Sequence, residues 1–221
     1  MTNSEIVNII DHTLLKSTAT ISDIETLCQE AINYNFASVC VNPCWVKVAS
    51  EYIKANKNTD YDVKTCTVIG FPLGANTKDV KIYETENAIE NGAQEIDMVI
   101  NIGLAKMGSW ELVEEEIAGV VKAAKGNCVK VIIETCYLTE EEIRQACEVA
   151  LKANASFVKT STGFGTSGAT SENVKIMRNA VEDKLGVKAA GGIRDKKSAL
   201  EMIEAGANRL GCSAGKEIIS E

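Results

Sequence analysis

The sequence predicts a single-domain (β/α)8 TIM barrel over residues 1–221, with a short N-terminal helix before the first strand. Short runs rich in β-branched and apolar residues alternate with longer stretches whose apolar residues recur at helical spacing. Such alternation indicates parallel strands with crossover helices, and eight units favour a closed barrel over an open doubly wound sheet. The predicted strands are 10–13, 36–41, 64–70, 95–101, 128–134, 156–160, 187–191 and 208–212.

An internal repeat supports the barrel and predicts which residues share a layer of its interior. Four segments can be laid in register: 35–40, 92–97, 154–159 and 206–211. Each begins with Asn or Gly, the residues that best tolerate the left-handed conformation at a helix C-terminus. All four then enter strands of even number, and equal positions on alternate strands share a layer inside a barrel. The last matched position is occupied by Cys40, Asp97, Lys159 and Gly211.

Capping residues predict where several helices begin. Ser22 with Glu25 and Thr139 with Glu142 have the spacing of capping boxes. Asp195 stands before another helical stretch, where a helix cap is its expected role.

Composition excludes several classes of partner. The net charge of −8 leaves no basic face for nucleic acid or an anionic membrane. No apolar run is long enough to span a membrane, and the N-terminus lacks a secretory pattern, so we expect a cytoplasmic protein. Most of the eight cysteines lie in apolar runs as reduced thiols. Cys40 and Cys44 have ligand-like spacing, but no second pair follows and His12 is the only histidine, so we expect no metal.

Charged residues inside the predicted strands indicate chemistry within the barrel. Lys130 and Lys188 lie among apolar or small residues, and Glu134 ends the fifth strand. Lysines are disfavoured on a strand face packed against helices, so these side chains are expected to point inward, toward Lys159 and Asp97. Burial and a neighbouring cation both favour a neutral, nucleophilic amine, which can form an imine with a carbonyl. A carboxylate beside a second lysine can move the protons, and no cofactor is required.

Glycine-rich loops late in the chain predict a phosphate site. They span 160–170, 190–195 and 211–215 and follow the sixth, seventh and eighth strands. Glycines let backbone N–H groups approach an anion, and the loops after strands seven and eight of such barrels frequently hold phosphate.

The chain resembles the deoxyribose-phosphate aldolase family of class I aldolases. The matching segments are DHTLLK (11–16), SVCVNP (38–43), VIGFPLG (68–74), EIDMVIN (95–101), VKVIIET (129–135), FVKTSTGF (157–164), KAAGGIR (188–194) and RLGCSAG (209–215). The resemblance implies reversible cleavage of 2-deoxy-D-ribose 5-phosphate to acetaldehyde and D-glyceraldehyde 3-phosphate, in the catabolism of deoxyribose phosphates. Members of this family are often dimers, so a homodimer is the assembly to test.

The resemblance also implies roles for individual residues. Lys159 matches the Schiff-base lysine, Lys188 the lysine that perturbs it, Asp97 the proton donor and acceptor, and Lys130 its neighbour on the fifth strand. The substrate-binding positions that the resemblance implies are Asp11, Thr13, Cys40, Thr160, Gly163, Gly191, Gly192, Arg194 and Ser213. Phe164 stands where some members carry a lysine, so we expect backbone amides and Arg194 to bind the phosphate. A C-terminal tyrosine that assists proton abstraction in some members is absent.

Three other functions are weighed against this one. Another imine-forming barrel aldolase, transaldolase-like or acting on keto acids, would share Lys159 but take a different donor. A non-catalytic barrel that binds sugar phosphates would be free to lose Lys159, Lys188 and Asp97, all of which are present. A phosphosugar isomerase would normally use a carboxylate base without paired lysines.

Overall fold

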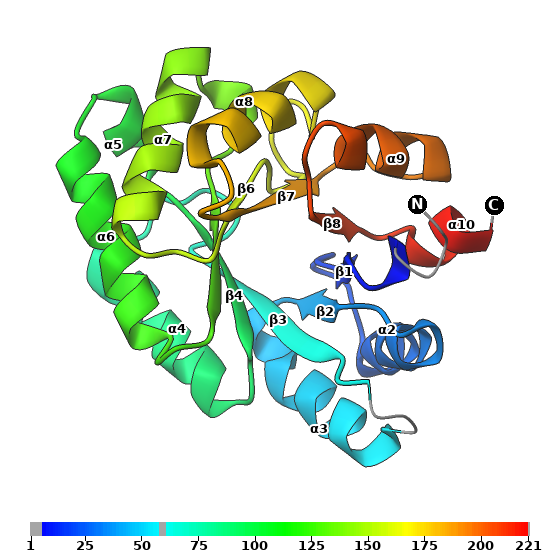
Figure 1. The fold of residues 1–221 in the computed structure, drawn as a ribbon. Coiled ribbons are helices and arrows are strands. Elements are labelled where there is room, and N and C mark those ends of the chain that lie inside the picture. The colour runs from blue at the N-terminus through cyan, green and yellow to red at the C-terminus, as the bar shows by residue number, and fades with distance from the viewer. Residues whose placement is uncertain (1–5, 58–60, 221) are drawn as a thin grey trace.

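The computed structural model describes residues 6–57 and 61–220, and its strands form a closed parallel barrel. Neighbours in the sequence pair with one another, and β8 closes the ring against β1 (Figure 1). The strands are β1 (Ile10–Leu14), β2 (Ser38–Val41), β3 (Lys64–Ile69), β4 (Glu95–Val99), β5 (Cys128–Ile132), β6 (Phe157–Lys159), β7 (Gly186–Ala190) and β8 (Arg209–Cys212). Each overlaps a strand predicted from the sequence, so the TIM-barrel prediction is confirmed.

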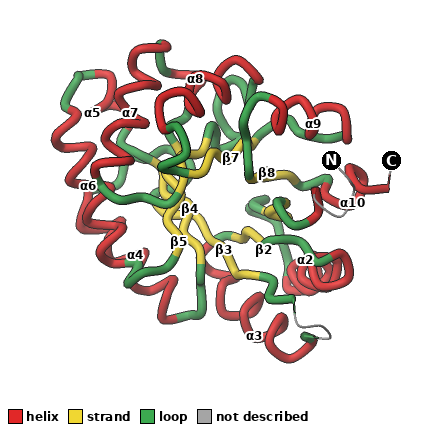
Figure 2. Tube along the Cα trace, in the orientation of Figure 1, coloured by secondary structure: helices red, strands yellow, loops and turns green. Residues whose placement is uncertain are grey.

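Helices surround the strands and form the outer layer of the barrel (Figure 2). The longer helices are α2 (Ile21–Tyr34), α3 (Val46–Asn56), α4 (Lys78–Glu90), α6 (Trp110–Ala123), α7 (Glu140–Lys152), α8 (Ser171–Val181) and α9 (Lys196–Glu204). Shorter helical segments are η1 (Pro43–Trp45), α5 (Ile102–Lys106), η2 (Thr135–Tyr137) and α10 (Gly215–Ser220). Strand residues such as Val39, Ile96 and Val158 belong to the apolar core, while their sequence neighbours face the barrel interior. The predicted N-terminal helix falls mostly on residues 1–5, outside the described residues.

The predicted repeat is confirmed by the backbone at its four starting positions. Asn35, Gly92, Asn154 and Gly206 all have positive φ, between 57° and 111°. Each ends a helix and turns the chain into an even-numbered strand, so the four strands enter the barrel in the same way.

The helix caps agree with the sequence at two positions and differ at a third. Thr139 forms the predicted capping box of α7 with Glu142, and Asp195 caps α9. The predicted box at Ser22 is wrong, because the side chain of Thr20 caps α2 and Asp23 completes the box. Two overlapping motifs compete there, and the chain begins the helix at the earlier one.

A buried ion pair joins the loop after β3 to the end of β4. Lys81 on α4 donates hydrogen bonds of 2.8 Å to the backbone oxygens of Gly74 and Val99 and to the carboxylate of Glu116. Burial lowers the pKa of Lys81, and Glu116 opposes that shift without cancelling it. The loop after β3 is therefore held against the barrel on the side where the strands end.

Candidate active site

Asp97 lies in the barrel interior and receives three lysine side chains. Its Oδ2 accepts hydrogen bonds from the Nζ atoms of Lys159 and Lys188, each at 2.7 Å, and its Oδ1 accepts one from Lys130 Nζ at 2.9 Å. The strand register explains why these side chains are close together. Asp97 on β4 pairs with Lys130 on β5, and Lys159 on β6 pairs with Lys188 on β7. All four are buried. The structure thus brings together the four residues expected to be catalytic.

The surroundings fix the charges of three of these groups. Burial alone would raise the pKa of Asp97, but the ammonium groups of the three lysines outweigh it and hold that pKa well below its usual value. Burial alone would lower the pKa of Lys188 and of Lys130, but nearby carboxylates, Asp97 among them, raise both above the ordinary lysine value. Asp97 is therefore a carboxylate, and Lys188 and Lys130 are ammonium ions.

Three further charged residues, Glu95, Arg209 and Asp11, complete the group around Asp97. Glu95 accepts from Lys130 at 2.6 Å and from Arg209 at 2.7 Å, and Arg209 also donates to Asp11 at 2.6 Å. Asp11 in turn pairs with Lys188 and accepts from the Ser38 hydroxyl at 2.6 Å. The whole set is called the barrel ion cluster below and comprises Asp11, Glu95, Asp97, Lys130, Lys159, Lys188 and Arg209.

Glu95 and Arg209 were not among the residues selected from the sequence. Both stand two positions before an inward-facing residue of the repeat, Asp97 and Gly211 respectively. Because side chains alternate along a strand, that spacing places them on the inner face as well. The spacing of Glu95 and Arg209 from the residues of the repeat therefore predicts that both side chains face the barrel interior.

A cavity of about 240 Å³ opens above Lys159 where the strands end. It is lined by the ends of β1, β6, β7 and β8 and by the loops that follow them. Among the candidate residues, those that line it are Thr13, Lys159, Gly163, Gly191, Gly192, Arg194 and Ser213. Lys159 is the member of the barrel ion cluster that reaches this cavity, and it remains only 3% exposed. An electrophile bound in the cavity would meet the amine of Lys159 before any other lysine of the cluster.

Three other candidates do not line the cavity and are fully buried. Asp11 belongs to the barrel ion cluster, and Cys40 faces the interior beside Asp97. The hydroxyl of Thr160 bridges to the backbone oxygen and N–H of Ala190, each at 3.1 Å, and so ties β6 to β7. In the described structure these residues support the cavity rather than line it.

The glycines of the late loops have the conformations that a close backbone approach requires. Gly163, Gly191 and Gly192 have φ values between 83° and 87°, a region that favours glycine. A Cβ atom at Gly168 would lie 2.2 Å from the backbone oxygen of Gly191, so these two loops can pack only through glycine. Their backbone amides are thereby brought to one wall of the cavity.

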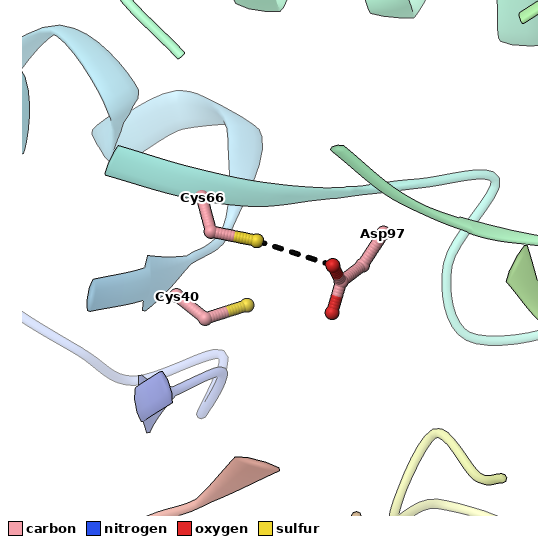
Figure 3. A group of neighbouring side chains, drawn as sticks. All are labelled: Cys40, Cys66 and Asp97. Carbon is pink, nitrogen blue, oxygen red and sulfur yellow. Dashed lines mark hydrogen bonds between the residues drawn. The ribbon is translucent and has the colours of Figure 1, made fainter. Parts of the chain in front are cut away.

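One group of side chains in the described part of the chain has the spacing of a metal site. The ligand atoms of Cys40, Cys66 and Asp97 lie within 4.8 Å of one another, and both thiols point toward the carboxylate (Figure 3). The Cys66 thiol contacts Asp97 at 3.2 Å. A metal ion bound there would have to displace lysine donors from Asp97. Cys44, which has ligand-like spacing from Cys40 in the sequence, is exposed on η1 and does not belong to this group.

The described chain has no helix with both the length and the apolar composition needed to cross a membrane. Residues 6–221 match the sequence model of the DeoC/LacD family of aldolases. The chain is 58% identical to a deoxyribose-phosphate aldolase from Clostridium tetani, covering 98% of this chain and 99% of that one. A relative of the same name from an Exiguobacterium species is 57% identical, covering 98% and 96%.

Solved structures with the same fold carry related names. A putative deoxyribose-phosphate aldolase from Coccidioides immitis superposes with a TM-score of 0.95 at 41% identity, covering all of this chain and 86% of the other. A tetrameric deoxyribose phosphate aldolase from Aeropyrum pernix superposes with a TM-score of 0.91 at 33% identity, covering 99% and 91%.

Proposed function

The chain belongs to the DeoC/LacD family of aldolases and is a carbon–carbon lyase, and we propose that it cleaves 2-deoxy-D-ribose 5-phosphate through an imine on Lys159. The products are acetaldehyde and D-glyceraldehyde 3-phosphate, and the reaction is reversible. The observation that supports Lys159 is its position as the cluster lysine that lines the cavity, with its Nζ on Asp97 at 2.7 Å. We propose that the pathway served is the catabolism of deoxyribose phosphates.

The charges of the barrel ion cluster support Lys159 as the nucleophile. The cluster holds four basic side chains and three carboxylates. Lys188 and Lys130 have raised pKa values and keep their protons. An arginine guanidinium stays charged in proteins. Lys159, which lines the cavity, is therefore the amine of the cluster that we assign to attack on a carbonyl.

The geometry suggests how protons move during the reaction. The neutral amine of Lys159 attacks C1 of the open-chain sugar, and loss of water from the carbinolamine gives the imine. The imine accepts the electron pair of the C2–C3 bond as the C3 hydroxyl loses its proton, which releases glyceraldehyde 3-phosphate and leaves an enamine. Protonation at C2 and hydrolysis then release acetaldehyde. Asp97 and Lys188 lie within a hydrogen bond of Lys159 or of each other and can relay these protons.

The phosphate group fits the wall that the late loops form. Gly163, Gly192 and Ser213 line the cavity, and their backbone amides together with the Ser213 hydroxyl can donate to an anion. Arg194 supplies a positive charge at the same wall. Asp11, Thr13, Cys40, Thr160 and Gly191 complete the proposed substrate site, either at the cavity or directly beneath it.

Trapping of the imine tests the proposal. Borohydride reduction in the presence of acetaldehyde is expected to add one ethyl group to Lys159, which peptide mass spectrometry locates. Lys175→Met, which changes an exposed lysine on α8, is the control and should be modified like the wild type. An adduct on another lysine, or none, contradicts the mechanism. A coupled assay with 2-deoxyribose 5-phosphate tests the substrate, and turnover of 2-keto-3-deoxy-6-phosphogluconate instead would favour a keto-acid aldolase.

We further propose that the chain acts as one domain in the cytoplasm. Pairing of β1 with β8 places the two ends of the described chain in one sheet, which supports one folding unit. All eight cysteines carry free thiols, as is usual in a reducing compartment. A homodimer remains a prediction, and sedimentation equilibrium would test it.

A further inference from the structure

Glu134 is a buried carboxylate outside the barrel ion cluster. It follows β5 and is 1% exposed. Within the described residues no lysine, arginine or histidine forms an ion pair with it, although buried carboxylates usually have such a partner. Its burial without a cation requires compensation from hydrogen-bond donors.

One residue of the cavity wall supplies most of that compensation. The backbone N–H of Thr162 lies 3.2 and 3.3 Å from the two carboxylate oxygens of Glu134, and the Thr162 hydroxyl donates to Oε2. The Cys136 thiol is a weaker donor at 3.8 Å. The hydroxyl of Thr162 also accepts from the backbone N–H of Phe164 at 3.0 Å. Glu134 thus holds the backbone N–H and the hydroxyl of Thr162. The Thr162 hydroxyl in turn holds the backbone N–H of Phe164.

The backbone around Glu134 is built to allow this contact. Glu134 has φ 54° and ψ 66°, a left-handed conformation that is unfavourable for a residue other than glycine. On the opposite loop, a Cβ atom at Gly165 would lie 2.7 Å from Cys136 Sγ and 3.2 Å from the carboxyl carbon of Glu134. The left-handed backbone of Glu134 and the absence of a side chain at Gly165 both let the carboxylate pack against the loop after β6.

The contact decides which amide of this loop remains available to a ligand. Thr162 donates its N–H to Glu134, and Phe164 donates its N–H to Thr162. Between them, Gly163 lines the cavity with φ 85°, and its N–H has no acceptor among the residues the structure describes. The two anchored neighbours hold this free amide in a fixed direction.

We propose that Glu134 is a positioning residue that presents the Gly163 amide to the phosphate group of the substrate. Glu134 reaches the substrate only through Thr162 and makes no contact with it. The inference rests on the proposed function for the identity of the phosphate-bearing substrate, but the anion site itself can be tested without turnover.

The main variant is Glu134→Gln, which keeps the shape of the side chain and replaces one acceptor oxygen by an NH₂ group. It leaves one of the two Thr162 donors without an acceptor. We expect the KM for 2-deoxyribose 5-phosphate and the Kd for inorganic phosphate to rise about tenfold, the factor that corresponds to one net hydrogen bond. The kcat/KM for unphosphorylated 2-deoxyribose should stay within about twofold, because Lys159 and Asp97 are not in contact with Glu134. Glu141→Gln, an exposed change on α7, is the matched control.

A second pair of variants tests the same link at its other end. Thr162→Val removes the hydroxyl and should weaken phosphate binding as Glu134→Gln does, whereas Thr162→Ser keeps the hydroxyl and should bind phosphate within about twofold of the wild type. This pair serves as the test if Glu134→Gln does not fold, as judged by thermal unfolding. Equal losses with both sugars, an unchanged Kd for phosphate, or equal effects of valine and serine would overturn the proposal. Phosphate binding by calorimetry needs no catalysis, so a wild type that binds phosphate but cleaves neither sugar would refute the proposed function alone.

Discussion

Replacing Lys188 by methionine tests whether its charge assists imine formation on Lys159. Methionine fills a similar volume and removes the ammonium group that contacts Asp97 and Asp11. Asp97 keeps Lys130 as a partner at 2.9 Å, and Asp11 keeps Arg209 at 2.6 Å, so neither carboxylate is left without a cation. The variant is therefore expected to fold.

The size of the effect follows from two distances. Nζ of Lys159 and Nζ of Lys188 each lie 2.7 Å from the same oxygen of Asp97, so they are at most 2.7 + 2.7 = 5.4 Å apart. With an effective dielectric constant of about 20, two positive charges at that distance repel by about 3 kcal/mol. At about 1.4 kcal/mol per factor of ten, this energy corresponds to about a hundredfold in rate. Without Lys188, imine formation on Lys159 should slow by about that factor.

The assay is the rate of borohydride trapping with acetaldehyde as a function of pH. Measured near neutral pH, this rate should fall by about a hundredfold in Lys188→Met. Lys175→Met should leave the rate unchanged. A rate in Lys188→Met that equals or exceeds the wild-type rate would refute the argument from charge repulsion.

Three further predictions concern the barrel interior. Lys159→Arg keeps a positive charge but cannot form the imine, so it should yield no acetaldehyde adduct and lose activity by more than about a thousandfold. Gly211→Ala would place a Cβ atom 2.9 Å from Lys188 Cε and should lower kcat by about tenfold with normal secondary structure by circular dichroism. The pKa values of Asp11 and Asp97 lie below the ordinary 3.8, so their stabilisation is full above that pH and is lost as the pH falls below it. Urea unfolding across acidic pH should show this loss, and an Asp97→Asn variant should show less of it.

The sequence predicted the architecture because the signals that set it are local. Asn35, Gly92, Asn154 and Gly206 end their helices in the left-handed conformation, which few residue types tolerate. The same register that aligned these residues placed Asp97 and Lys159 in the barrel interior, where their side chains meet at 2.7 Å. Helix starts were harder to predict, since Thr20 and Ser22 both offer a cap to α2 and Thr20, with Asp23, forms the one observed.

Other features could not be predicted because they depend on contacts between distant segments. Lys81 lies on a helix, where a lysine normally faces solvent, and its burial follows from backbone oxygens on the loop after β3 and at the end of β4. Glu134 was recognised as a charge at the end of a strand, but its partner Thr162 is 28 positions away. Phe164 packs edge-on against Phe71 at 5.3 Å, a contact that joins two loops with no shared sequence signal.

The barrel ion cluster also bears on the proton transfer that links the protonated imine to the enamine. These two species differ by one proton, and a group that accepts and returns it must lie near Lys159. Asp97 is the nearest carboxylate, but three lysines lower its pKa, which makes it a weak base on its own. When the protonated imine becomes the enamine, its nitrogen loses its positive charge, so the basicity of Asp97 rises as that proton is transferred. Asp97 can therefore accept the proton at that step, and Lys188, an ammonium ion 2.7 Å from Asp97, can donate a proton in the reverse direction.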